Sequence, residues 1–241
     1  MLILALDTTT RGGSVAVSDD DRTLAIVAGD ASRTHGERLP GEMQRALDEA
    51  GVQPRDLGLL VVASGPGAFT GLRIGLAAIQ GLALALGLPV VGVSALDALA
   101  LAAAPMTLGS PLDMLIVWRD AQRGEVFAGR YQRHPASTAP AWTPLGDATV
   151  GAPPEQLAAD SGRASRRIAF AGEGAVIHRD LIARWSPDSP IVEPPDALAP
   201  ALTTIGRRLA AEGHAGPPHA LQPLYVRRPD AEIERLRRST S

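Results

Sequence analysis

A glycine-rich turn joins the clearest strand of this sequence to its clearest helix, and it constrains the fold more than any other stretch. Residues 59–63 form a continuous apolar run, which predicts a strand covered on both faces. The helix is expected to run from Leu72 to Leu86, with the hydroxyl of Thr70 as its cap. Glycines at positions 65, 67 and 71 let the backbone bend sharply between them. The chain therefore contains a buried strand that passes directly into a long helix.

Such a turn can bind phosphate, because its amide groups lie beside a helix N-terminus. A P-loop requires Gly-Lys-Ser/Thr, but Gly71 is followed by Leu72 and the chain contains no lysine. The dinucleotide motif G-x-G-x-x-G is also absent, since the third glycine lies one position too far along the chain. A tight turn that binds no ligand is therefore the favoured interpretation.

Composition limits the class of protein. With 241 residues, of which 45% are hydrophobic, the chain can bury a sizeable core in one domain or two small ones. A net charge of −3 gives no general attraction to nucleic acid or anionic membrane, and the lack of cysteine excludes disulfides and thiolate chemistry. The apolar region 74–93 contains four glycines and a proline, which argues against a membrane span. A cytoplasmic location is the expectation, since the N-terminus also lacks the pattern of a signal peptide.

The apolar pattern predicts an α/β protein with two halves of similar plan. In the first half, the expected strands are 2–6, 14–18, 23–27, 59–63 and 90–93. A helix is expected between the third and fourth strands; it starts near residues 34–36 and has Pro40 in its first turn. The long helix follows strand 59–63, and a helix from Ser94 to Ala103 follows strand 90–93. After a break at 106–111, strand 114–118, an aspartate, a turn and a returning strand repeat the opening plan. The predicted domains are residues 1–105 and 106–229, followed by a charged tail at 230–241.

The rest of the second half gives weaker patterns. A long surface loop is expected at 133–154, and the expected elements after it are strand 168–171, helix 175–185 and helix 196–212. The charged end at 227–238 could contact RNA, but a solvated end is the favoured interpretation.

Two aspartates, Asp7 and Asp120, follow the first strand of each half. They are expected to hold a metal-bound nucleotide if the halves face a shared cleft, and an equally supported alternative is that they cap turns. The five histidines include no pair at helical spacing, so the sequence predicts no helical metal site. Ser64 lacks the G-x-S-x-G frame of an exposed nucleophile, which argues against hydrolase chemistry.

The long helix is apolar on two sides. One side carries small residues that favour close packing on a sheet, namely Gly75, Ala78, Ile79, Leu82 and Leu86. The opposite stripe has only two polar members and is predicted to be a partner interface: Arg73, Leu76, Ala77, Gln80 and Leu84. The alternative is that another part of this chain covers the stripe.

Motifs along most of the chain resemble the TsaB (YeaZ-type) family of tRNA threonylcarbamoyladenosine biosynthesis proteins. The main motif is Ser64-Gly-Pro-Gly-Ala-Phe-Thr-Gly-Leu-Arg-Ile-Gly-Leu-Ala77, with Asp7-Thr8-Thr9 before it. Four further motifs support it, and they begin at His35, Asp120, Gly172 and Pro223. The Pro-rich stretch from about residue 133 to 156 and the charged tail are not covered by the resemblance.

The resemblance implies a fold of the actin-like ATPase superfamily, with two ribonuclease-H-like halves. It also implies a vestigial nucleotide cleft that consists of Asp7, Thr8, Thr9, Asp120, Gly172 and Gly174. A protein of this family is expected to be the non-catalytic partner of TsaD, to act with TsaE, and to meet tRNA only through that complex. Without its partner it could be a monomer or a homodimer.

The same resemblance implies that catalytic residues, metal and cofactor are absent. TsaD carries two metal-binding histidines in a V-x-H-x-x-x-H motif, and this chain has Ala95 and Leu99 at those places. The competing hypothesis is an active ATP-dependent enzyme of the same superfamily, either kinase-like or peptidase-like. Asp7, Asp120 and the turn at 172–174 support that alternative, whereas the missing ligands and the absent lysine oppose it.

Overall fold

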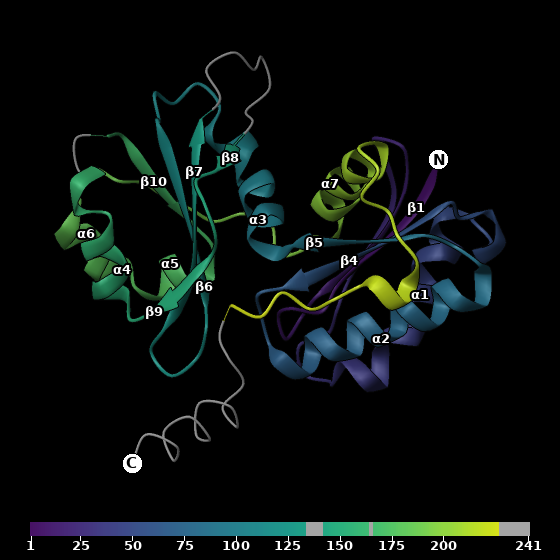
Figure 1. The fold of residues 1–241 in the computed structure, drawn as a ribbon. Helices are drawn as coiled ribbons and strands as arrows, with labels where there is room; N and C mark the ends of the chain where they lie inside the picture. Colours follow the sequence, from purple (N-terminus) through teal and green to yellow (C-terminus); the bar gives the residue numbers. More distant parts are fainter. Residues whose placement is uncertain (134–141, 164–165, 227–241) are drawn as a thin grey trace.

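Two lobes, each built on one sheet, make up the protein in a computed structural model that describes residues 1–133, 142–163 and 166–226 (Figure 1). The first sheet has the order β3-β2-β1-β4-β5, and its strands are β1 Leu2–Asp7, β2 Ser14–Asp19, β3 Arg22–Ala28, β4 Leu59–Gly65 and β5 Val90–Ser94. The second has the order β11-β10-β6-β7-β8, and its strands are β6 Met114–Asp120, β7 Val126–Arg133, β8 Trp142–Pro144, β10 Ile168–Ala171 and β11 Ile191–Val192. A short strand, β9 Thr149–Gly151, also pairs with β7.

The two sheets repeat one plan. β1 runs antiparallel to β2 and parallel to β4, and β6 runs antiparallel to β7 and parallel to β10 in the same way. In both halves the central strand ends at an aspartate, Asp7 or Asp120. The predicted α/β class with two halves of similar plan is therefore confirmed.

Helices cover both faces of the first sheet. α1 (His35–Ala50) and α2 (Phe69–Leu86) lie on one face, and α7 (Ala199–Ala211) lies on the other (Figure 1). Successive side chains of β1 alternate between these faces, so Leu4 and Leu6 pack towards α1 and α2 while Ile3 and Ala5 pack towards α7. All four are fully buried, which explains why the strand reads as a continuous apolar run.

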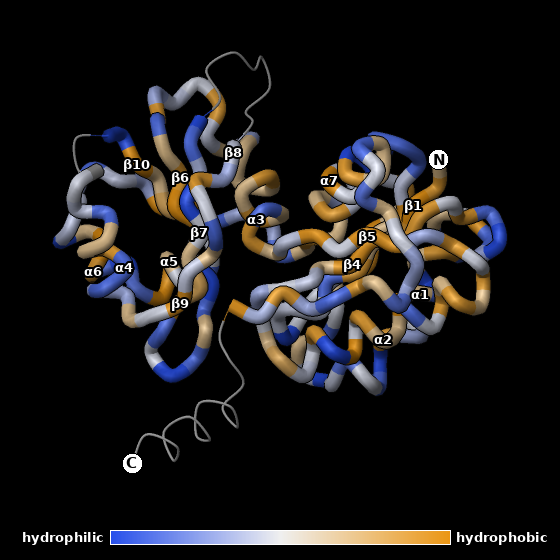
Figure 2. The backbone as a smooth tube through the Cα atoms, viewed as in Figure 1, coloured by the Kyte–Doolittle hydropathy of each residue, from blue (hydrophilic) through white to orange (hydrophobic). Residues whose placement is uncertain are grey.

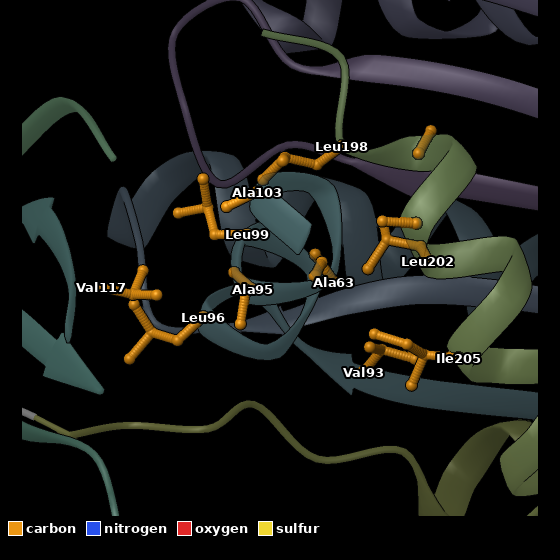
Figure 3. Packing of buried hydrophobic residues seen from close by; sticks show 14 of the residues in the cluster. Ala63, Val93, Ala95, Leu96, Leu99, Ala103, Val117, Leu198, Leu202 and Ile205 are labelled. Carbon is orange, nitrogen blue, oxygen red and sulfur yellow. The ribbon is translucent and has the colours of Figure 1, made fainter. Parts of the chain in front are cut away.

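A helix at the lobe junction, α3 (Ala95–Ala103), joins the cores of the two sheets. The predicted cap is confirmed, because the Ser94 hydroxyl accepts a hydrogen bond from the Asp97 backbone amide. Figure 3 shows Leu96 and Leu99 of this helix near Val117 of β6, with Leu202 of α7 in the same apolar cluster. One continuous core therefore crosses from lobe to lobe.

The outer face of the second sheet is covered by three short helices, α4 (Pro153–Ala159), α5 (Glu173–Ile177) and α6 (Arg179–Trp185). Trp118 of β6 packs edge-on against Phe170 of β10 in this core, with ring centroids 5.4 Å apart. Four 3-10 turns complete the described elements: η1 Pro54–Asp56, η2 Ala104–Thr107, η3 Ser161–Arg163 and η4 Pro218–Ala220.

Several predicted boundaries are wrong in detail. α2 begins at Phe69 and Thr70 does not cap it, because the amide of Ala68 donates to the carbonyl of Thr9 and fixes the helix start earlier. Pro40 is the sixth residue of α1 and so lies in the second turn, although the helix does start at the predicted place. The expected helix 175–185 is divided at His178 into α5 and α6. The expected loop 133–154 contains β8 and β9, because both pair with β7.

The end of the chain returns to the first lobe. α7 packs on β1, β2, β4 and β5, and the C-terminal strap, which we define as residues 214–226, runs over the first lobe to the gap between lobes (Figure 1). The last described part of the predicted second domain, 106–229, therefore packs on the first sheet and not only on the second. The predicted tail at 230–241 lies outside the described residues.

α2 is long and apolar enough to cross a membrane by length and composition alone. This is weak evidence, because a helix packed on a sheet meets the same criteria. α2 lies against β4, and Figure 2 shows the hydrophobic strands of the first sheet behind it.

Candidate functional site

The turn after β1 forms the first wall of the predicted nucleotide cleft. Asp7, Thr8 and Thr9 are all buried, with exposed fractions of 1%, 0% and 3%. The amide and the hydroxyl of Thr9 both donate to Oδ1 of Asp7, at 2.8 and 2.5 Å. One carboxylate oxygen of Asp7 is therefore committed to holding its own turn.

The glycine-rich turn packs against this wall at close range. A Cβ on Gly71 would lie 2.2 Å from the carbonyl oxygen of Thr8, and a Cβ on Gly75 would lie 2.1 Å from the Thr8 hydroxyl oxygen. A Cβ on Gly67 would lie 2.5 Å from Cβ of Thr9. The glycines are thus required for close approach of α2 to the first turn, which explains the motif without a ligand.

A buried charged network from α1 holds the far side of the same turn. Arg38 and Glu42 form an ion pair with both carboxylate oxygens 2.6 Å from Nη1, and both side chains are less than 10% exposed. Nη2 of Arg38 also donates to the carbonyl oxygens of Arg11 and Gly12. His35 contacts the carbonyl of Thr10 at 2.7 Å through Nε2. Two side chains of α1, His35 and Arg38, therefore hold residues 10–12, and Glu42 holds Arg38 in place.

Arg119 reaches the site from the second lobe. Its side chain is 1% exposed, and Nη1 donates to the hydroxyl of Thr9 at 2.6 Å. Its Nε donates to Glu173 at 3.1 Å, so the guanidinium lies between the two halves. A chain of hydrogen bonds thus runs from Asp7 through Thr9 to Arg119 and Glu173.

Asp120 does not mirror the environment of Asp7. Its Oδ1 accepts from the backbone amide of Gln122 at 2.8 Å, and its Oδ2 accepts from the Gln122 side chain at 2.6 Å. Both oxygens therefore cap the β6–β7 turn, as the structural alternative predicts.

The predicted glycines of the second half also pack tightly. A Cβ on Gly172, where φ is +96°, would lie 2.4 Å from the carbonyl oxygen of Trp118. A Cβ on Gly174 would lie 3.0 Å from the carbonyl carbon of Arg119. Each half therefore uses glycines to seat a turn on the end of its central strand, as Gly71 does in the first half.

Two buried oxygens of the predicted cleft have no hydrogen-bond partner, namely Oδ2 of Asp7 and Oγ1 of Thr8. Either atom could form a hydrogen bond with a water molecule at this place or bind a cation. Within residues 1–133, 142–163 and 166–226, no group of three or more His, Cys, Asp and Glu could hold a metal ion. The first wall therefore offers one unpaired carboxylate oxygen, on Asp7, in the turn that Arg119 contacts through Thr9.

The lobe junction holds a second polar pair. The hydroxyl of Tyr131, on β7, donates to Asp97 of α3 at 2.8 Å. Burial raises the pKa of the Asp97 carboxyl, and the hydrogen bond from Tyr131 opposes that shift. Burial, together with the neighbouring carboxylate, raises the pKa of the Tyr131 hydroxyl.

The predicted interface stripe of α2 is divided by the fold. Leu76 is only 6% exposed, because the buried face of α2 includes Leu72 and Leu76 as well as Ile79, which was predicted to pack on the sheet. The side chain of Gln80 donates to the carbonyl of Pro218 in the C-terminal strap at 2.9 Å. The other three predicted residues remain exposed: Arg73, Ala77 and Leu84.

Sequence reasoning missed four residues that build this site: Arg38, Glu42, Arg119 and Glu173. Two of them could have been found, because charged residues at i and i+4 in α1 form helical pairs. Arg119 also carried a signal, since it interrupts the apolar run of β6 one residue before Asp120. Its partner Thr9 lies 110 positions away, which no local pattern indicates.

Comparison with known proteins gives the family. The family model described as TsaD, tRNA N6-adenosine threonylcarbamoyltransferase, matches residues 21–233. The solved structure of YeaZ from Pseudomonas aeruginosa is 30% identical, with a TM-score of 0.74 over 93% of this chain and 99% of that chain. The chain belongs to the TsaB (YeaZ-type) family.

Two further relatives are similar to this chain. The tRNA threonylcarbamoyladenosine biosynthesis protein TsaB of Escherichia coli is 38% identical over 133 residues, which span 55% of this chain and 56% of that protein. An uncharacterized protein of Mycobacterium tuberculosis is 35% identical over 234 residues, which span 95% of this chain and 93% of that protein.

Proposed function

We propose that this protein is a non-catalytic subunit in the biosynthesis of threonylcarbamoyladenosine in tRNA, and that it binds TsaD through the exposed face of α2. It acts with TsaE in the cytoplasm and meets tRNA through the complex. The name of the Escherichia coli relative supports the pathway, and the matching TsaD family model supports a paralogous partner of similar fold.

The exposed face of α2 is the observation that carries the proposal. We define this face by Arg73, Ala77, Gly81 and Leu84, which follow one another at helical spacing and are all exposed. Leu84 is 73% exposed, and only Arg73 carries a charge. A solvated helix face normally carries more charge, whereas an apolar face with small residues permits close approach of a partner helix.

The non-catalytic part of the proposal is supported by the contacts of the predicted cleft. The hydroxyl of Thr9 accepts the hydrogen bond from Arg119, and both oxygens of Asp120 bind Gln122. A catalytic metal-nucleotide site needs carboxylates that remain available for the metal or its waters. The contacts of Thr9 and Asp120 therefore favour a structural role.

Substitution of Ala77 by Glu tests the interface. The change should leave the isolated protein folded and weaken binding to TsaD by about a hundredfold, because an interface would bury the new carboxylate without a partner. Ala183→Glu is the matched control, since it adds the same charge to an exposed alanine of α6 in the other lobe. Affinity measured by calorimetry and folding measured by circular dichroism distinguish the two effects.

A folded Ala77→Glu protein that binds TsaD as tightly as the wild type would contradict the interface proposal.

The alternative of an active enzyme has its own test. The isolated protein should hydrolyse ATP no faster than a buffer blank, because it has no lysine to stabilise developing phosphate charge and both oxygens of Asp120 already accept hydrogen bonds from Gln122. Steady turnover that Asp7→Ala abolishes would support the enzyme instead.

A further inference from the structure

An exposed aromatic pair lies where the C-terminal strap crosses the start of α2. The rings of Phe69 and Tyr225 are stacked, with centroids 5.6 Å apart and planes 29° apart. Phe69 is 44% exposed and Tyr225 is 40% exposed. The chain has only three phenylalanines and two tyrosines, so the pair concentrates a scarce residue type at one place on the surface.

Arginine completes the group, which we call the aromatic platform: Phe69, Arg73 and Tyr225. The guanidinium carbon of Arg73 lies 4.0 Å from the centroid of the Phe69 ring, and its Nε donates to the Tyr225 hydroxyl at 3.2 Å. Among the described residues no carboxylate lies within ion-pair distance of Arg73, so its positive charge is uncompensated. The platform therefore combines two stacked rings with one positive charge.

The platform is held rigidly although it is exposed. Next to Tyr225, the amide of Leu224 donates to the carbonyl of Ser64 at 2.7 Å. Phe69 is the first residue of α2, whose position is fixed by the glycine contacts with Thr8. Docking of the strap accounts for these backbone contacts, but it does not require aromatic rings that remain two-fifths exposed. By contrast, Trp118 and Phe170 meet edge-on and are fully buried.

We propose that the aromatic platform binds an unpaired base of an RNA strand. Unpaired RNA bases stack on aromatic rings and on guanidinium planes, and a neighbouring positive charge attracts the phosphate that follows the base. The N-terminus of α2 adds positive potential, since its N-cap residue, Ala68, provides no side-chain cap.

A polymer fits the platform better than a free nucleotide does. Two cavities of the described structure, of about 510 and 230 Å³, are lined by other residues and include neither ring. A base that stacks on an open surface needs the rest of its strand for affinity. The inference deepens the proposed function, because it places a direct RNA contact on this subunit.

Binding of a fluorescein-labelled, single-stranded oligoadenylate to the full chain at low ionic strength tests the proposal. Fluorescence anisotropy should show weaker binding by about tenfold for Phe69→Leu and for Tyr225→Leu, the loss of roughly one stacked base. Both variants keep an apolar side chain and remove the ring. Ile26→Ala is the control, because it removes an exposed apolar side chain of the first lobe that belongs neither to the platform nor to the exposed face of α2.

A second measurement needs no variant. An oligonucleotide that carries 2-aminopurine should lose fluorescence when it binds the wild-type protein, because stacking on an aromatic ring quenches this base. Absence of binding, equal affinity for single-stranded and duplex RNA, or unchanged affinity in both variants would overturn the proposal.

The experiments distinguish a wrong RNA-binding proposal from a wrong proposal for TsaD binding. If Phe69→Leu weakens binding to TsaD and leaves RNA binding unchanged, the platform is a protein contact and the RNA proposal is wrong. If the variant loses RNA binding and still binds TsaD, both proposals stand. Loss of TsaD binding in Ala77→Glu tests only the interface.

Discussion

Arg119, on the second sheet, donates a hydrogen bond of 2.6 Å to the hydroxyl of Thr9, at the end of the central strand of the first sheet. The two residues belong to different halves of the chain, and both are buried. This bond lies where the family resemblance implies a nucleotide cleft, so a side chain of the protein occupies the contact with Thr9.

Loss of this contact should lower stability. Arg119→Ala removes charged hydrogen bonds to Thr9 and Glu173, and we expect a decrease of about 2 kcal/mol in the free energy of unfolding. Urea denaturation measures the change. Arg179→Ala is the control, because its ion pair with Glu193 is exposed on both sides and should contribute about 0.5 kcal/mol or less. Equal effects of the two substitutions would contradict the structural role of Arg119.

The buried pair in α1 gives a second prediction. Glu42→Ala leaves the guanidinium of Arg38 buried without its carboxylate, and we expect a loss of about 3 to 5 kcal/mol in unfolding free energy. Glu49→Ala removes an exposed carboxylate at the same spacing in the same helix, from its pair with Arg45, and should change stability little. Comparable midpoints of urea denaturation for the two variants would show that burial of the first pair is unimportant.

Substitution by alanine should change the stability of the protein in opposite directions at two glycines of α2. Gly75→Ala places a methyl group against the hydroxyl of Thr8, so we expect destabilisation of about 1 to 3 kcal/mol. Gly81→Ala meets no atom within 4 Å and should stabilise the helix by about 0.5 to 1 kcal/mol. Thermal unfolding of both variants checks the sign. Stabilisation by Gly75→Ala would mean that the first turn does not press on α2.

Asp113 provides a prediction for acidic pH. Hydrogen bonds from Arg167 lower the pKa of this carboxyl to about 2, below its ordinary value of 3.8. The lowered pKa means that the stabilising effect of the pair is present above the ordinary value and is lost as the pH falls towards 2. Carbon NMR titration of the carboxyl should show this low pKa in the wild type and a higher one in Arg167→Gln. An unchanged titration in the variant would contradict the assigned cause.

Elements with strong local patterns could be predicted from the sequence. The hairpin of β1 and β2, the passage from β4 into α2, and the capped start of α3 each depend on residues close together in the chain. The repeat of strand, aspartate and turn also predicted that Asp7 and Asp120 occupy matching places.

Features that depend on distant contacts could not be predicted in the same way. β8 and β9 have three residues each and form because β7 offers them an edge. The burial of Leu76 depends on how α2 is rotated about its own axis against the sheet, which helical periodicity alone does not fix. The role of Asp120 differs from that of Asp7 because Gln122 binds both of its oxygens, a difference within one turn that the shared strand pattern conceals.

The return of α7 to the first sheet affects how the chain can fold during synthesis. Ile3, Ala5 and Val61 face α7, so the first sheet keeps one bare apolar face until residues 199–211 have left the ribosome. A fragment that ends at residue 105 would carry this face permanently and should aggregate. The first lobe to be translated is therefore the last to be completed.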